Sequence, residues 1–360
     1  MHPAFDRPSP WRAALLAASL VALSAVVPGG REGVARAASE APEGVSETGG
    51  EAGGDGAAAE WVADEPFVRE IAPGDFVHSG RQEDMSAANA GDIANIGFVV
   101  GERSVAVIDP GGSLAVARAL RDALRATTPL PVSHVILTHF HPDHVFGASV
   151  FAGEGADADD GTGGGTDAPL VVAHANLARA RVQRGAFYAD RYPTLLDGRG
   201  TAALVAPSVE VARGETLEID LGGRVLRLRA WPTAHTDNDL SVFDVATGTL
   251  WAGDLLFASR TPSLDGSLPG WLAALEGLGE PVPERVVPGH GAVGSFEAVA
   301  APERAYLDRL LGETRAAIAG GGRLAEAIDR AERAPAGEWL LFGLQHPTNV
   351  TRAWAELEWE

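Results

Sequence analysis

Residues 138–144 carry the clearest potential for chemistry in this chain, because they read THFHPDH. Imidazole and carboxylate are the side chains that Zn²⁺ and similar divalent ions prefer. His139 and His141 are two residues apart, so in an extended chain they face the same side and can bind one ion together. Asp143 and His144 fall in the turn that follows, where they would face a second ion. The spacing therefore predicts a metal site rather than a polar loop with incidental histidines.

The surrounding segments indicate how this cluster is positioned. The apolar run 132–137 predicts a buried strand, and Pro142 suits the first position of a helix, where its missing N–H loses nothing. Further strands are expected at 95–100, 104–109, 170–173, 209–219, 224–230, 240–245 and 248–251. Helices are expected at 114–126, 175–183, 271–278, 302–319 and 323–332. This pattern predicts an α/β protein with two mixed β-sheets packed face to face and flanked by helices.

Three further motifs accompany apolar strands, and each holds one potential ligand. His235 lies in AHTDND, Asp254 in LWAGDL and His290 in VVPGHG. A single histidine of this kind is ordinarily a surface or capping residue. In this order after the first cluster, the three motifs indicate one shared site.

The order HxHxDH, H, D, H resembles the signature of the metallo-β-lactamase superfamily of metal hydrolases, over residues 95–291. The resemblance implies an αββα sandwich with two divalent metal ions at one edge, Zn²⁺ being the expected ion. The implied ligands are His139, His141 and His235 for the first ion, Asp143, His144 and His290 for the second, and Asp254 as the bridge.

A narrower resemblance is to the quinoprotein relay system metallohydrolases and to hydrolases encoded near sulfur-oxidation genes. It rests on three stretches, at 95–100, 260–272 and 349–360. These stretches are less specific than the ligand motif, and they do not define a substrate.

The superfamily resemblance implies a hydrolase in which a metal-bound hydroxide attacks an ester-, thioester- or lactone-type bond. Asp143 would be the catalytic residue that orients the hydroxide and takes its proton. Three other residues are candidates for supporting roles. Asp109 would support the metal loop or form an ordinary Asp-Pro turn, and His174 would stand behind the ligands or be structural. Arg260 would bind an anionic substrate group or be a surface arginine.

Two alternative functions remain at this stage. β-Lactamases carry Cys or Ser where this chain has Asp254, which favours thioesterase-, glyoxalase II- and lactonase-like activity. The motifs around His235 and His290 nevertheless also resemble those of true β-lactamases. A non-catalytic metal-binding accessory protein of a quinone- or sulfur-linked redox system is the other alternative, although structural zinc sites are usually closed and four-coordinate.

Composition limits the partners. The net charge is −21, all 28 basic residues are Arg, and there is no cysteine. A surface this acidic argues against nucleic acid and anionic membranes as partners. A small-molecule substrate is expected, and the oligomeric state is left open.

The N-terminus has the pattern of an export signal. Arg7 and Arg12 precede an apolar run at 13–27, which is short for a membrane span, and an A-x-A site ends at Ala37. The predicted organisation is a signal peptide at 1–37, a disordered linker at 38–64 and a hydrolase domain with C-terminal helices at 65–360. The mature protein would be periplasmic or secreted, without stable membrane association; an uncleaved anchor is the alternative.

Cleavage after Ala37 predicts that N-terminal sequencing of the protein recovered from the periplasm or medium will begin at residue 38. The basic start, the apolar run and the A-x-A site together motivate this expectation. A protein that begins at Met1 and sediments with membranes would establish the anchor instead.

Overall fold

A computed structural model of the protein describes residues 66–152 and 168–360. The predicted signal peptide (1–37) and linker (38–64) lie outside these residues. Among the described helices, none is both long enough and apolar enough to cross a bilayer.

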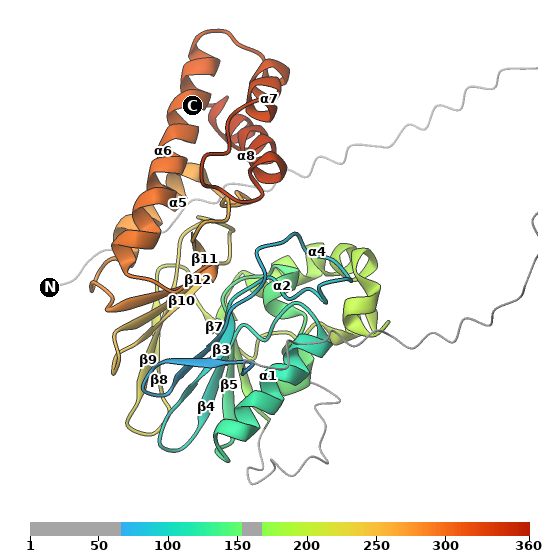
Figure 1. The fold of residues 1–360 in the computed structure, drawn as a ribbon, viewed down its shortest axis with the longest axis vertical. Helices are drawn as coiled ribbons and strands as arrows, with labels where there is room; N and C mark the ends of the chain where they lie inside the picture. The colour runs from blue at the N-terminus through green and yellow to red at the C-terminus, as the bar shows by residue number, and fades with distance from the viewer. Residues whose placement is uncertain (1–65, 153–167) are drawn as a thin grey trace, which may run out of the picture. The chain divides into compact units, whose positions relative to one another are not determined.

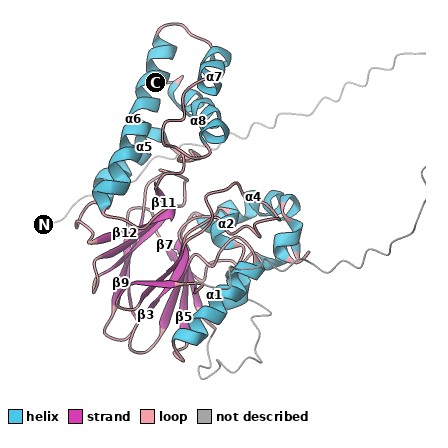
Figure 2. Cartoon of the chain, in the orientation of Figure 1, coloured by secondary structure: helices cyan, strands magenta, loops and turns pink. Residues whose placement is uncertain are grey.

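Two mixed sheets form the centre of the described chain (Figures 1 and 2). The first sheet has the order β1-β2-β3-β4-β5-β6-β7, antiparallel from β1 to β4 and parallel from β4 to β7. Its strands are β1 (Arg69–Ala72), β2 (Asp75–His78), β3 (Ile96–Val100), β4 (Val105–Ile108), β5 (Val132–Leu137), β6 (Leu170–His174) and β7 (Val209–Val211).

The second sheet has the order β12-β11-β10-β9-β8, in which only β11 and β12 are parallel among the described strands. Its strands are β8 (Thr216–Asp220), β9 (Val225–Ala230), β10 (Leu240–Asp244), β11 (Thr249–Phe257) and β12 (Arg285–His290). Apolar side chains from both sheets, among them Val99, Ile136 and Trp251, share one buried cluster between the layers. The predicted face-to-face packing of two mixed sheets is confirmed.

Helices cover the outer faces. The first sheet packs with α1 (Leu114–Thr127), α3 (Ala148–Phe151), α4 (Leu177–Arg191) and the 3-10 turns at Pro193–Leu196 and Gly200–Ala203. The second packs with α5 (Leu268–Leu278), α6 (Phe296–Ala319), α7 (Leu324–Glu332) and α8 (Phe342–Leu357). The short helix α2 (Pro142–Val145) begins at Pro142, as predicted.

Several predicted boundaries were wrong. The run 209–219 is not one strand: β7 pairs with β6 in the first sheet, whereas β8 pairs with β9 in the second. The chain turns between them through Gly214, whose φ of 83° is readily adopted by glycine. Apolar alternation identifies an extended segment but not the sheet that it joins. In addition, α4 runs on to Arg191, α6 begins before Pro302, and α8 was not predicted.

A buried ionic cluster joins the two sheets away from the predicted ligands. Asp75 of β2 and Asp244 of β10 are both fully buried, and Arg224 pairs with both carboxylates. The Thr247 hydroxyl lies 2.7 Å from Asp75 Oδ2 and 2.6 Å from Asp244 Oδ2, yet its single proton can serve only one of them. Burial raises the pKa of Asp75 to about 6, and the neighbouring Asp244 charge acts in the same direction.

Stability should therefore fall as pH rises through about 6, because the folded state holds the Asp75 proton more tightly than the unfolded chain does. Asp75→Asn removes this titration. We expect the difference in melting temperature between Asp75→Asn and the parent to shift in favour of the variant between about pH 4 and about pH 7, and to be constant above that. A difference that stays constant over this range would show that Asp75 is ionised throughout.

Candidate metal centre

The first sheet supplies four of the predicted ligands from the end of one strand. β5 ends at Leu137, and the next residues place His139 and His141 before α2. Asp143 and His144 lie in α2 itself. The loop is fixed from the second sheet, because Phe140 N donates to Asn238 Oδ1 at 2.8 Å.

The second sheet supplies the other three. His235 lies in the turn between β9 and β10, and His290 ends β12. Asp254 was expected after a strand ending at Trp251, but β11 continues to Phe257 and carries Asp254 within it. The register between β11 and β12 shifts between Gly253 and Phe257, so the strand is irregular at the ligand. Such irregularities re-aim side chains at functional sites.

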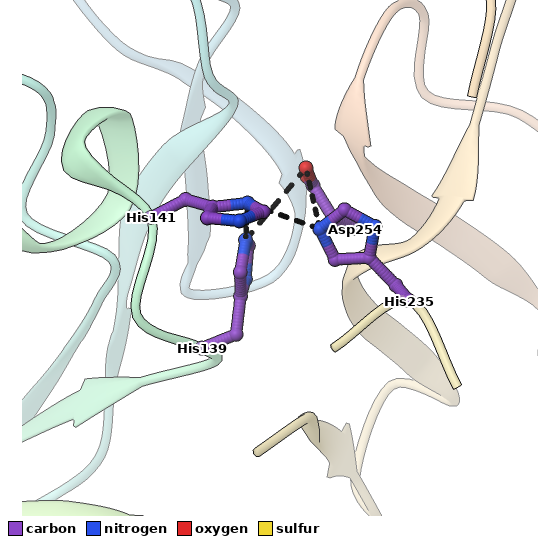
Figure 3. A group of neighbouring side chains, drawn as sticks. All are labelled: His139, His141, His235 and Asp254. Atoms are coloured by element: carbon purple, nitrogen blue, oxygen red, sulfur yellow. Dashed lines mark hydrogen bonds and ion pairs between the residues drawn. The ribbon is translucent and has the colours of Figure 1, made fainter. Parts of the chain in front are cut away.

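The seven predicted ligands converge in two groups. One contains His139, His141, His235 and Asp254, and the other contains Asp143, His144 and His290; within each group the ligand atoms lie within 4.8 Å of one another. Figure 3 shows the first group, whose side chains point toward a common centre.

Asp254 faces both groups. Its Oδ2 lies 3.7 Å from His139 Nε2 and 3.5 Å from His235 Nε2. Its Oδ1 lies 3.1 Å from His144 Nε2 and 3.4 Å from His290 Nε2. One carboxylate thus presents one oxygen to each group, which is the arrangement expected of a bridging ligand.

The donor set fits divalent cations. His144 Nε2 and Asp254 Oδ1 are buried and have no hydrogen-bond partner in the described part of the chain. Buried polar atoms without partners are costly and call for an explanation, one of which is an ion. Five imidazoles and two carboxylates match the preferences of Zn²⁺ and related metals.

In three of the predicted ligands, the ring nitrogen that faces away from the site donates a hydrogen bond to an acceptor, and this bond fixes the tautomer of the ring. His144 Nδ1 donates to Asp109 Oδ2 at 2.8 Å, and His290 Nδ1 donates to the Ile93 carbonyl at 2.7 Å. His235 Nδ1 donates to the Ser263 carbonyl at 2.6 Å. In the neutral form of each ring, the Nε2 lone pair is therefore directed into the site.

His141 is held the opposite way round. Its Nδ1 faces His139 Nε2 at 3.0 Å and His235 Nε2 at 3.1 Å, and its Nε2 lies 3.4 Å from Asp265 Oδ2. The ring therefore turns Nδ1 inward, with Asp265 behind it.

The two residues predicted to support the ligands differ in what they contact. Besides His144, Asp109 accepts from Thr138 N at 2.8 Å and Thr138 Oγ1 at 2.7 Å. Its φ of 49° is an uncommon left-handed conformation for a non-glycine residue. Among the described residues, the hydrogen bonds of His174 are to backbone: its Nε2 donates to the Trp231 carbonyl at 3.2 Å, and its Nδ1 accepts from Asn176 N at 2.9 Å.

Burial sets the charge state of the first group. It lowers the pKa of His235 to about 4 and holds the pKa of His139 well below its usual value. Both rings are therefore neutral at pH 7, the form that binds metal. For His144, burial opposes the charged form, but the nearby carboxylates, Asp254 first, outweigh it and raise the pKa well above its usual value. Metal binding at the second group should consequently release a proton.

A cavity of about 340 Å³ reaches the ligands His141, Asp143, Asp254 and His290. Arg260 lines it, as a substrate-binding residue should, but its Nη1 also donates to the Glu83 carbonyl at 3.0 Å. Its role in binding an anionic group stays a prediction. The apolar part of the wall consists of Met85, Ile93, Pro142, Phe187, Tyr188 and Tyr192.

Sequence reasoning missed the residues that hold the ligand loops. Asn95 Nδ2 donates to the carbonyls of Pro288 and Gly291, both at 2.8 Å, and so brackets His290. Asn238 holds the first ligand loop, and Asp265 stands behind His141. Asn95 and Asp265 do lie in the stretches that carry the narrower resemblance, but nothing in their spacing indicated these contacts.

Comparison with known proteins identifies a family for most of the two-sheet region. A family model described as the metallo-beta-lactamase superfamily matches residues 89–290. No curated protein matches the chain in a sequence search. The narrower resemblance to quinoprotein relay system hydrolases stays a prediction.

Similar solved structures show the same fold. A metallo-beta-lactamase from Pontibacter korlensis is 19% identical, with a TM-score of 0.51 over 67% of this chain and 98% of that one. A metallo-beta-lactamase from Hirschia baltica is 18% identical, with a TM-score of 0.50 over 67% and 96%. A double mutant of the sec-alkyl sulfatase PisA1 is 16% identical, with a TM-score of 0.59 over 81% of this chain and 50% of that one.

Asp109→Asn and His174→Ala form a matched pair of buried substitutions. Only Asp109 contacts a predicted ligand, so Asp109→Asn should weaken binding of one metal ion by about 10- to 100-fold, the usual cost of losing such a partner. His174→Ala should leave both affinities within a few-fold of the parent. Metal titration with elemental analysis measures this, and equal losses in the two variants would contradict it.

Proposed function

The chain belongs to the metallo-beta-lactamase superfamily, and we propose that this metallo-hydrolase binds two divalent ions, Zn²⁺ by preference, and hydrolyses an ester-, thioester- or lactone-type bond of a small molecule. The observation that carries the proposal is the Asp254 carboxylate, with one oxygen toward each ligand group. This favours a pair of ions at one centre over a single closed structural site.

Ions held there would polarise the substrate's reacting oxygen and make water a competent nucleophile near neutral pH. The chain's own contribution is position and charge. Asp143 lines the cavity, and its Oδ2 lies 3.3 Å from His290 Nε2. It is therefore placed to orient a water molecule between the ligand groups and the substrate, and to accept a proton from it.

The cavity wall supports a substrate with an apolar part. Met85 and Ile93 come from the segment before β3, whereas Tyr188 and Tyr192 come from α4 and its end. Phe187 is 68% exposed, so it could cover an apolar group at the entrance. An acyl chain or ring against this wall would bring its carbonyl toward Asp143.

β-Lactam hydrolysis is the second candidate, because solved structures named as metallo-beta-lactamases share the fold over nearly their whole length. Two features of the sequence oppose it. The bridging position holds Asp254 in place of the Cys or Ser of β-lactamases, and no Lys exists to bind the lactam carboxylate. A non-catalytic accessory role would leave the cavity at the ligands without a use.

We also propose that the enzyme acts after export, in the periplasm or outside the cell, in the setting suggested by the resemblance to quinone- and sulfur-linked hydrolases. The sequence pattern before residue 38 supports this proposal, and the N-terminal sequencing described above tests it.

A side-by-side assay tests the chemistry. Protein reconstituted with Zn²⁺ should hold two ions, and it should turn over esters, thioesters or lactones faster than penicillins or carbapenems. Asp143→Asn should lower kcat at least 100-fold, the scale of a lost positioning or proton-transfer group, while the first group retains its ion. Lactam turnover with esters untouched would establish the second candidate, and a single ion without turnover would establish the accessory role.

A further inference from the structure

Helix α8 lies beyond the family-matched residues 89–290, yet one of its faces contacts the segment that stands behind two of the predicted ligands. Val350, Ala353, Trp354 and Leu357 form an apolar stripe in the second core cluster. Asn349, Arg352 and Glu356 are spaced by three and four residues and therefore share another face. We call these three residues the site-facing stripe. All three contact the segment 262–268, which leads from β11 into α5.

Asn349 fixes the peptide units on both sides of Ser263. Its side chain is 1% exposed; Nδ2 donates to the Pro262 carbonyl at 2.7 Å, and Oδ1 accepts from Leu264 N at 2.9 Å. Between these two bonds, the Ser263 carbonyl accepts from His235 Nδ1 at 2.6 Å. The orientation of that carbonyl, and with it the tautomer of His235, depends on Asn349.

Arg352 acts on the neighbouring residue. Its Nη2 lies 3.0 Å from Asp265 Oδ1, while the other oxygen, Oδ2, pairs with Arg184 of α4 and faces His141 Nε2. Two guanidinium groups thus hold the carboxylate that stands behind His141. Asp265 N also donates to the His235 carbonyl at 3.0 Å, which ties the two ligand contacts together.

Glu356 secures the far end of the segment. It accepts from Ser267 Oγ at 2.6 Å and from Leu268 N at 2.8 Å, at the first turn of α5. A carboxylate at a helix N-terminus is favourable because it meets unpaired N–H groups and the positive end of the dipole.

We propose that the site-facing stripe of α8 positions His141 and His235, so that the first metal group depends on the C-terminal helix and the second does not. In the second group, His144 is held by Asp109 and His290 by the Ile93 carbonyl, both within the first-sheet half of the protein. Arg260 Nη1 also lies 3.3 Å from His290 Nδ1, but Arg260 is not a residue of α8. Asn349 and Arg352 are positioning residues, since they act through Ser263 and Asp265. This inference rests on the proposed two-ion function.

The experiment compares Asn349→Ala with His346→Ala as a matched control. His346 is on the same helix, is 3% exposed and bonds to Tyr306 Oη at 3.1 Å, a hydroxyl that Asn349 Nδ2 also contacts at 2.7 Å. Among the described residues, however, His346 makes no hydrogen bond of its own to the segment 262–268. The full mature protein of each variant is titrated with Co²⁺, and the two binding events are followed by absorption and calorimetry. The tautomers of His235 and His141 are read from ¹⁵N-histidine NMR of the same samples.

Asn349→Ala should lower the affinity for one of the two Co²⁺ ions by about 10- to 100-fold and leave the affinity for the other within about threefold of the parent. The His235 Nδ1–H signal should shift or broaden in the same variant. His346→Ala should change neither the Co²⁺ affinities nor the His235 Nδ1–H signal, even if it lowers the melting temperature as much as Asn349→Ala does.

Arg352→Ala keeps the inference testable if Asn349→Ala does not fold, because the Arg352 side chain is 56% exposed. It should weaken the same equivalent by about two- to fivefold, the contribution of an exposed ion pair, and Arg352→Lys should restore most of the loss. Equal weakening of both equivalents, or no change in either, would overturn the inference. A parent protein that binds fewer than two ions would instead refute the proposed function.

Discussion

The Asp254 carboxylate, buried between two groups of imidazoles, is the constraint on which the rest of the structure depends. A carboxylate removed from water is costly unless charges or hydrogen-bond donors surround it. Here the imidazole nitrogens approach from both sheets, at 3.1 to 3.7 Å from its two oxygens. The rings can direct lone pairs inward only if their outer nitrogens have acceptors elsewhere. An outer N–H left buried without one would cost about 1–3 kcal/mol.

The fold meets this requirement with buried amides as well as with strands. Asn238, Asn95 and Asn349 each bond to backbone beside a ligand or beside the residue that holds one. In each case a side-chain amide replaces a backbone partner that an irregular loop lacks. Three loops from different parts of the chain are thereby fixed, where strands alone would leave them free to move.

The class of fold followed from apolar periodicity, and the seven residues that converge followed from the ligand motifs together with the family resemblance that those motifs carry. The sequence was insufficient for features that depend on which strands pair with one another across long stretches of the chain. The run 209–219 looked like one strand because apolar alternation is the same in either sheet. Asp254 was expected in a loop after Trp251, but β11 continues through Gly253 and includes Asp254. The anchors of His235 and His290 are backbone carbonyls, which any residue could supply, so no side-chain pattern could reveal them. Helix α8 was obscured by Pro347 in its first half.

The two ligand groups therefore differ in the origin of their rigidity. Asp109 directly follows β4, a strand of a seven-stranded sheet within the described residues, and Ile93 lies three residues before β3 of the same sheet begins at Ile96. Ser263 and Asp265 lie in a connection without secondary structure of its own, and a connection of this kind is ordinarily mobile. It is held instead by side chains of α4 and α8, which lie on the outer faces of different sheets. Because α4 also supplies aromatic residues of the cavity wall, Arg184 links Asp265, and through it His141, to the helix that borders the cavity. The first ligand group is thus braced by a helix that also lines the space at the ligands.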